Sequence, residues 1–123
     1  MQYTYEINSE NQTIYVTTKG DLITKEVVLM GLEILLEANK NNYKVIFDHR
    51  FSKNRISIGE AYNWFSSYYD SNNIELRRIP TAYIANKEDW DFYSFFELAC
   101  SNKCIPLKVF QDENTALEWL KGL

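Results

Sequence analysis

Short β-type runs alternate with longer amphipathic runs along most of this chain. One short run, Lys44-Val-Ile-Phe-Asp48, is almost wholly apolar between its charged ends. It is too short for a helix, and such a run is typical of a central parallel strand that is buried on both faces. Parallel neighbours need crossover connections, which are usually helices. The run therefore predicts an α/β domain with helices packed against a sheet.

The chain opens with a different pattern, because apolar and polar side chains alternate over residues 2–7. This is the period of a half-buried strand. A polar turn and the β-branched run Thr13–Lys19 follow, and Gly20 ends that run. We therefore expect an antiparallel hairpin at the start of the chain.

The remaining elements follow from 3.6-residue spacing and from capping residues. Helices are predicted over Thr24–Asn39, Ser57–Asp70, Asn86–Ser101 and from Asp112 onwards, and further strands over Arg78–Ala85 and Leu107–Phe110. In the first helix we expect the buried face to hold Val27, Val28, Leu32, Leu35 and Leu36. The order predicts a single α/β domain over residues 1–123, an N-terminal β-hairpin followed by successive βα units in a mostly parallel sheet. A length of 123 residues with 46% hydrophobic content fits one core.

Charge, cysteine and glycine content exclude several classes of protein. The net charge of −4 and the lack of a basic patch argue against a nucleic-acid binder. Cys100, Cys104 and the single histidine are too few for a structural zinc site, so we expect no metal and two reduced thiols, with a redox pair as the less supported alternative. No phosphate-binding or dinucleotide-binding glycine motif occurs, so no cofactor is expected. No apolar run approaches a transmembrane segment and no export signal is visible, which predicts a cytoplasmic protein.

Polar and charged residues gather after the central strand, where ligands of α/β sheets bind. The segment that follows Asp48 holds a candidate anion site: His49, Arg50, Lys53, Arg55 and Ser57. Because Ser57 begins a helix, its free backbone N–H groups and the nearby cations suit a phosphate, a sulfate or a carboxylate. The alternative is that the cations are solvated and that Ser57 only caps the helix, in a capping box with Glu60.

A catalytic role for His49 is the less supported hypothesis. Adjacent strand residues point to opposite faces, so Asp48 is poorly placed to orient the imidazole. No nucleophile-elbow motif accompanies Ser57. We expect no enzyme and no catalytic residue here, with a weak hydrolase using His49 as the remaining alternative.

Aromatic residues make up 15% of the chain and exceed what single helix faces bury. The surplus predicts an aromatic patch that forms a homodimer or holds an apolar ligand, with these candidates: Trp64, Tyr68, Tyr69, Trp90 and Tyr93. The alternative is a thick core with amphipathic rings at its margin.

The hairpin, Gly20, the strand that ends at Asp48, and the closing segment Val109-Phe110-x-Asp112-Glu113-x-x-Ala116-Leu117-x-Trp119-Leu120 together resemble the SpoIIAA-like family. These are small bacterial proteins of the STAS type, sometimes grouped with SEC14-like domains. The resemblance covers nearly the whole chain and implies a fold of successive βα turns and a binding or regulatory role. STAS antagonists carry a phosphorylatable serine in Asp-Ser-x-Gly, and this chain has Ile56-Ser57-Ile58-Gly59. Ser57 is accordingly a candidate phosphorylation site.

Together these points predict a non-catalytic, cytoplasmic STAS-like binding or regulatory domain that contacts an unknown protein partner and forms a homodimer. The alternative is a carrier of a small ligand, either an anion held by Arg50, Lys53, Arg55 and Ser57 or a lipid beneath the aromatic helices. Nucleic acid is not expected as a partner.

Overall fold

The computed structural model describes residues 1–69 and 75–123, with side chains described for all of these except residues 65–69. The strands are β1 (Gln2–Asn8), β2 (Thr13–Leu22), β3 (Lys44–Asp48), β4 (Ser52–Asn54), β5 (Thr81–Ile84) and β6 (Leu107–Phe110). The helices are α1 (Thr24–Asn41), α2 (Ile58–Tyr69), α3 (Trp90–Asn102) and α4 (Glu113–Lys121), with a 3-10 turn, η1 (Leu76–Arg78). None of the helices in the described ranges is both long and apolar enough to cross a membrane.

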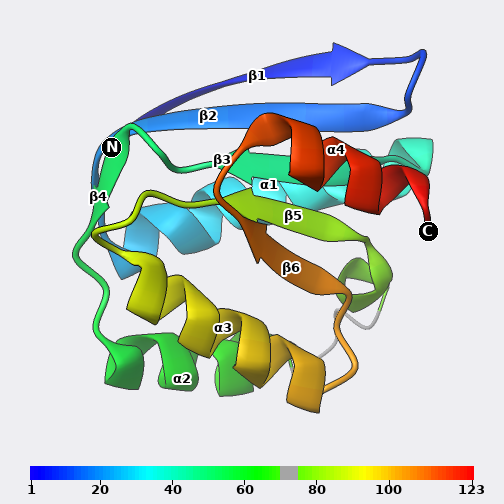
Figure 1. Ribbon diagram of the computed structural model, residues 1–123. Coiled ribbons are helices and arrows are strands. Elements are labelled where there is room, and N and C mark those ends of the chain that lie inside the picture. The colour runs from blue at the N-terminus through cyan, green and yellow to red at the C-terminus, as the bar shows by residue number, and fades with distance from the viewer. Residues whose placement is uncertain (70–74) are drawn as a thin grey trace.

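The strands form one sheet in the order β1-β2-β3-β5-β6, and β4 pairs with the end of β2 (Figure 1). Among the described strands, only the β1–β2 pair is antiparallel, and each other pair is parallel. The predicted α/β architecture, an N-terminal hairpin followed by parallel βα units, is therefore confirmed. The central strand Lys44–Asp48 and the last strand Leu107–Phe110 have the predicted bounds.

The two faces of the sheet are covered unequally. One face carries the larger core, built with α1, α2 and α3. The other carries a small cluster in which Ile46 and Ala82 pack with Ala116 and Leu120 of α4. Helix α4 contacts β5 and β6 and lies in front of the sheet in Figure 1. Much of this face over β1 and β2 therefore lacks a covering helix.

The hairpin is longer than predicted, and β4 was not predicted. Gly20 does not end β2, because it adopts a φ of 91° and the strand continues to Leu22. Glycine enters this region without the steric penalty of other residues. The extra residues Gly20–Leu22 pair with β4, which lies in the segment expected to be a loop. Three residues with polar side chains are too few to show the periodicity from which a strand is predicted.

Two helices differ from the prediction in detail. The buried residues of α1 are Val27, Met30, Ile34, Leu35 and Ala38, whereas the predicted core residue Leu36 is 51% exposed. The spacing of both sets is nearly helical, and only packing selects between them. Helix α3 begins at Trp90 rather than at Asn86, because the Asn86 side chain closes a turn by accepting the Asp89 N–H at 2.9 Å.

Candidate functional site

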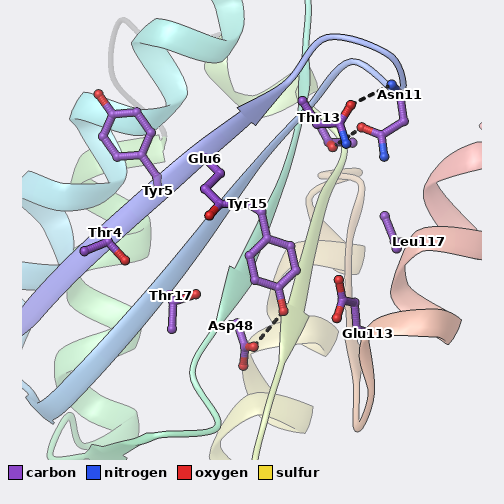
Figure 2. Close-up of a pocket in the computed structure, with 11 residues that line it drawn as sticks. Thr4, Tyr5, Glu6, Asn11, Thr13, Tyr15, Thr17, Asp48, Glu113 and Leu117 are labelled. Carbon is purple, nitrogen blue, oxygen red and sulfur yellow. Dashed lines mark hydrogen bonds between the residues drawn. The ribbon is translucent and has the colours of Figure 1, made fainter.

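A groove of about 440 Å³ lies on the part of the sheet that α4 leaves uncovered. We call it the open-face groove, and its walls come from the hairpin, the end of β3 and the start of α4 (Figure 2). Its principal lining side chains are Thr4, Glu6, Asn11, Thr13, Tyr15, Thr17, Asp48, Glu113 and Leu117. Most of these are hydroxyl or carboxylate groups, so the groove is polar and acidic.

At the floor of the groove Asp48 forms an ion pair with Arg50, and the Asp48 side chain is only 2% exposed. The Tyr15 hydroxyl donates to its Oδ2 at 2.7 Å, as does Arg50 Nη2 at 2.7 Å. Arg50 also donates to Oδ1 through Nε at 3.0 Å and through its backbone N–H at 3.1 Å. Burial tends to raise the pKa of Asp48, but the hydrogen bonds from Arg50 and Tyr15 outweigh it and hold the pKa below its usual value. Asp48 is therefore a fixed anion near neutral pH.

Tyr15 stands between the floor and the rim. Burial and its hydrogen bond to Asp48 raise the pKa of Tyr15, so its hydroxyl remains a proton donor. The rim carries the exposed carboxylates of Glu6 on β1 and Glu113 on α4, and Figure 2 shows Tyr15 lying between them. Within the described part of the chain neither carboxylate has an ion-pair partner. The groove thus offers free negative charge at the rim above a neutralised floor.

His49 lies on the opposite face of the sheet, as its alternation with Asp48 predicted. It is 2% exposed, and its ring stacks between Phe47 at 5.9 Å and Tyr93 at 5.7 Å. Its Nδ1 is 2.8 Å from the Thr18 hydroxyl oxygen. Burial lowers the pKa of His49 to about 4, so the imidazole is neutral at physiological pH. The predicted place of His49 in an anion site does not fit this position, and no substrate could reach it as a base.

A buried polar network, which the sequence did not reveal, ties this edge of the sheet together. Ser52 donates its hydroxyl hydrogen to Thr18 Oγ1 at 2.7 Å, and Asn86 Nδ2 donates to the Ser52 carbonyl at 2.9 Å. The backbone N–H of Asn54 in turn donates to Asp89 Oδ2 at 2.9 Å. These bonds join β2, β4 and the segment after β5, so the polar residues here serve the fold.

In the structure Ser57 caps helix α2 in a capping box with Glu60, as the helix-capping alternative described. The Glu60 N–H donates to Ser57 Oγ at 3.1 Å, and Glu60 Oε1 accepts the Ser57 N–H at 3.2 Å. Thr24 also donates to Glu60, at 2.9 Å. A carboxylate of the chain itself therefore occupies the start of α2, where the predicted anion was to bind. Ser57 is exposed, which leaves it open to modification.

The predicted cations divide between different partners. Arg55 Nε lies 3.4 Å from Asp21 Oδ2, and Arg50 is committed to Asp48. Arg50 and Lys53 do line one hollow of about 490 Å³, together with Lys87 and the carboxylates of Asp21 and Glu88. The structure therefore brings only two of the predicted anion-site residues together.

The aromatic candidates lie mainly in or against the core. Tyr93 is 2% exposed, so it offers no surface to a partner. Trp64 is partly buried, with its ring 5.2 Å from that of Phe96, and Trp90 also packs against the core. The side chains of Tyr68 and Tyr69 lie outside the described part of the chain. The space expected for an apolar ligand beneath α3 is occupied by interlocking rings.

Sequence reasoning missed the open-face groove because its residues are far apart in the chain. Thr4 and Glu6 share one side of β1, a set visible in the alternation of residues 2–7. The register pairs Glu6 with Tyr15 and Thr17 with Asp48, which brings the set together. That register and the position of α4 are not encoded in any local pattern.

No protein-family model matches this chain, and no curated protein does. A solved structure is similar: an uncharacterized protein of the DUF3478 family with a SpoIIAA-like fold, from Shewanella loihica PV-4. It is 18% identical, the match covers 97% of this chain and 92% of that chain, and the TM-score is 0.54. The chain therefore has a SpoIIAA-like fold, as the resemblance in the sequence predicted.

Proposed function

We propose that this chain is a non-catalytic, STAS-like binding domain that recognises a positively charged segment of a partner protein in the open-face groove. The observation that carries this proposal is the uncovered, acidic stretch of sheet between Glu6 and Glu113. Exposed concave surfaces that the fold leaves uncovered are common binding sites. A basic side chain would enter between the two carboxylates and reach the Tyr15 hydroxyl.

The charge distribution favours a cation over an anion. Asp48 is already neutralised by Arg50, whereas Glu6 and Glu113 have no ion-pair partner among the described residues and can pair with incoming charge. Complementary charge at a rim raises the association rate and selects partners more than it adds affinity. A binding role rather than catalysis is supported by the same residues, because Asp48 is fixed as an anion and His49 is sealed in the core.

Titration with a fluorescein-labelled hexalysine peptide tests the proposal, with a hexaglutamate peptide as the reverse-charge control. We expect hexalysine to bind with an affinity that falls as salt rises. A Glu6→Gln, Glu113→Gln double variant should bind on the order of fivefold more weakly, since each partly exposed ion pair contributes up to ~1 kcal/mol.

A Glu10→Gln, Glu118→Gln double variant is the matched control, because it removes the same charge from exposed positions outside the groove. Its affinity for hexalysine should stay close to that of the unaltered protein. Equal weakening in both double variants would show that net charge alone, and not the groove, determines the affinity. Absence of hexalysine binding would refute the proposal.

The second candidate is a small anion held by Arg50 and Lys53. One observation favours it: Asp48 fixes the Arg50 guanidinium at the border of a hollow that Lys53 and Lys87 also line. Inorganic phosphate should then raise the melting temperature, and a Lys53→Ala, Lys87→Ala variant should lose that shift. If phosphate still raises the melting temperature of the Lys53→Ala, Lys87→Ala variant, this hollow is excluded as the anion site.

A further inference from the structure

The two edge strands of the sheet, β6 and β1, differ in length and in how far other groups bond to them. Strand β6 is four residues long, and the Glu97 carboxylate of α3 accepts the Val109 N–H at 2.7 Å. Strand β1 is seven residues long and pairs with β2 without a bulge, from Gln2 opposite Lys19 to Asn8 opposite Thr13. It is the outermost strand in Figure 1, with no described strand beyond it. Its sequence holds no proline or lysine, the residues that commonly prevent an exposed edge strand from pairing with another chain.

An exposed apolar surface accompanies this free edge. Tyr5 is 42% and Ile7 49% exposed on the α1 side of β1. Leu29 and Leu36 of α1 are 60% and 51% exposed. The Tyr3 hydroxyl donates to Glu33, which lies between these two leucines on the same stripe of the helix. The stripe and the apolar side of β1 therefore form one surface along the edge of the sheet.

We propose that β1 pairs antiparallel with β1 of a second copy of this chain, about a two-fold axis beside Tyr5. Residues that face each other in such a pair share one side of the sheet, so the axis must pass beside a residue and not between two. Only an axis at Tyr5 pairs the whole strand. Gln2 then faces the partner's Asn8, Tyr3 the partner's Ile7, Thr4 the partner's Glu6, and Tyr5 its own counterpart.

This register avoids like charges and adds an aromatic pair. Glu6 is the one charged residue of β1, and it would face a threonine. An axis at Glu6 would instead place two carboxylates opposite each other, which is unfavourable. Tyr5 packing on its counterpart joins the apolar sides of the two strands. Such self-complementarity is what an isologous two-fold interface requires, so the strand fits a second copy.

The exposed stripe of α1 lies at the level of the same axis. The Tyr3–Glu33 hydrogen bond sets the level of the strand against the helix. Two residues along a strand correspond to about four along a helix, so Tyr5 lies roughly level with Leu36. Helix α1 packs against β2 and β3, so β1 and the partner's β1 lie between the two α1 helices, and the interface rests on the paired strands and not on helix contacts.

Sedimentation equilibrium of the full chain tests this inference. We expect a dimer at micromolar concentration, and at least a tenfold weaker association for Tyr5→Lys, which sets two ammonium groups on the axis. Tyr62→Lys is the matched control, because Tyr62 is 61% exposed on α2 and lies outside the proposed interface. A monomeric unaltered protein, or a dimer that Tyr5→Lys leaves intact, would overturn the inference.

Disulfide trapping tests the register independently of how well Tyr5→Lys folds. In a Cys104→Ser background, which removes the exposed native thiol, Tyr5→Cys should form a disulfide-linked dimer on mild oxidation. Thr4→Cys should form far less, because Thr4 faces the partner's Glu6 and not its own counterpart. Equal trapping at both positions, or trapping at neither, would refute the register. Hexalysine binding is measured separately, so the groove and the dimer can fail independently.

Discussion

Acid should destabilise this domain through His49, and a phenylalanine at that position should abolish most of the effect. The buried imidazole has a pKa of about 4, against 6.5 when exposed, because burial disfavours its charged form. As pH falls, the unfolded chain takes up the proton first. The contribution of neutral His49 to stability is therefore complete above pH 6.5 and is lost as pH falls toward 4.

The size of the effect follows from the two pKa values. Each pKa unit corresponds to about 1.4 kcal/mol, so the free energy of unfolding should fall by about 3 kcal/mol over the whole window and by about 2 kcal/mol at pH 5. His49 is the only histidine in the chain. Asp48, whose pKa is lowered from 3.8 in the folded chain, is still ionised at pH 5 in both states, so its contribution to stability is lost at lower pH than that of His49.

Urea denaturation near pH 7 and near pH 5 measures this difference for the unaltered protein and for His49→Phe. A phenyl ring fits the stack between Phe47 and Tyr93, and Thr18 keeps the hydrogen bond donated by Ser52. We expect the unaltered protein to lose about 2 kcal/mol between the two conditions and the variant to lose much less. An equal loss in both proteins would show that another group carries the acid sensitivity and would refute the reasoning.

Three further outcomes follow from single contacts. Ser57→Ala removes the cap of α2 and should lower the free energy of unfolding by about 1 kcal/mol in urea denaturation. Arg50→Met leaves the Asp48 carboxylate buried without its cation and should lower it by roughly 3 kcal/mol, most of which the Asp48→Asn, Arg50→Met double variant should restore. Cys100 is buried and its pKa is raised to about 12 by burial, whereas Cys104 is exposed, so a thiol reagent should modify only Cys104 until the chain is unfolded.

Local patterns predicted the elements that carry a strong period. The alternation over residues 2–7 and the apolar run of β3 are strand signals, and the Asp112 cap of α4, which accepts the Thr115 N–H at 2.9 Å, is a helix signal. Each depends on neighbours in sequence, so tertiary context did not override it. Strand β4 exists only because β2 continues through Gly20 to meet it, and nothing near Ser52–Asn54 signals that pairing.

The structure separates several residues of the candidate anion site that the prediction had grouped by closeness in sequence. His49, Arg50 and Arg55 follow one strand, yet the first enters the core, the second binds Asp48 and the third pairs with Asp21. Alternation along β3 separates neighbours to opposite faces, which sequence reasoning used for Asp48 and His49 but did not extend to the whole segment. Side-chain partners from other strands decided the rest.

The alternation of β1 connects the two proposals. Thr4 and Glu6 face the open-face groove, while Tyr5 and Ile7 face α1 and stay half-exposed because α1 packs against β2 and β3. Because β1 lies at the edge of the sheet, it extends beyond the helix that packs against β2 and β3. One strand therefore presents a polar surface to a cationic segment and an apolar edge to a second copy. Because the two sets point to opposite sides, Glu6→Gln should weaken peptide binding more than association, and Tyr5→Lys should weaken association more than peptide binding.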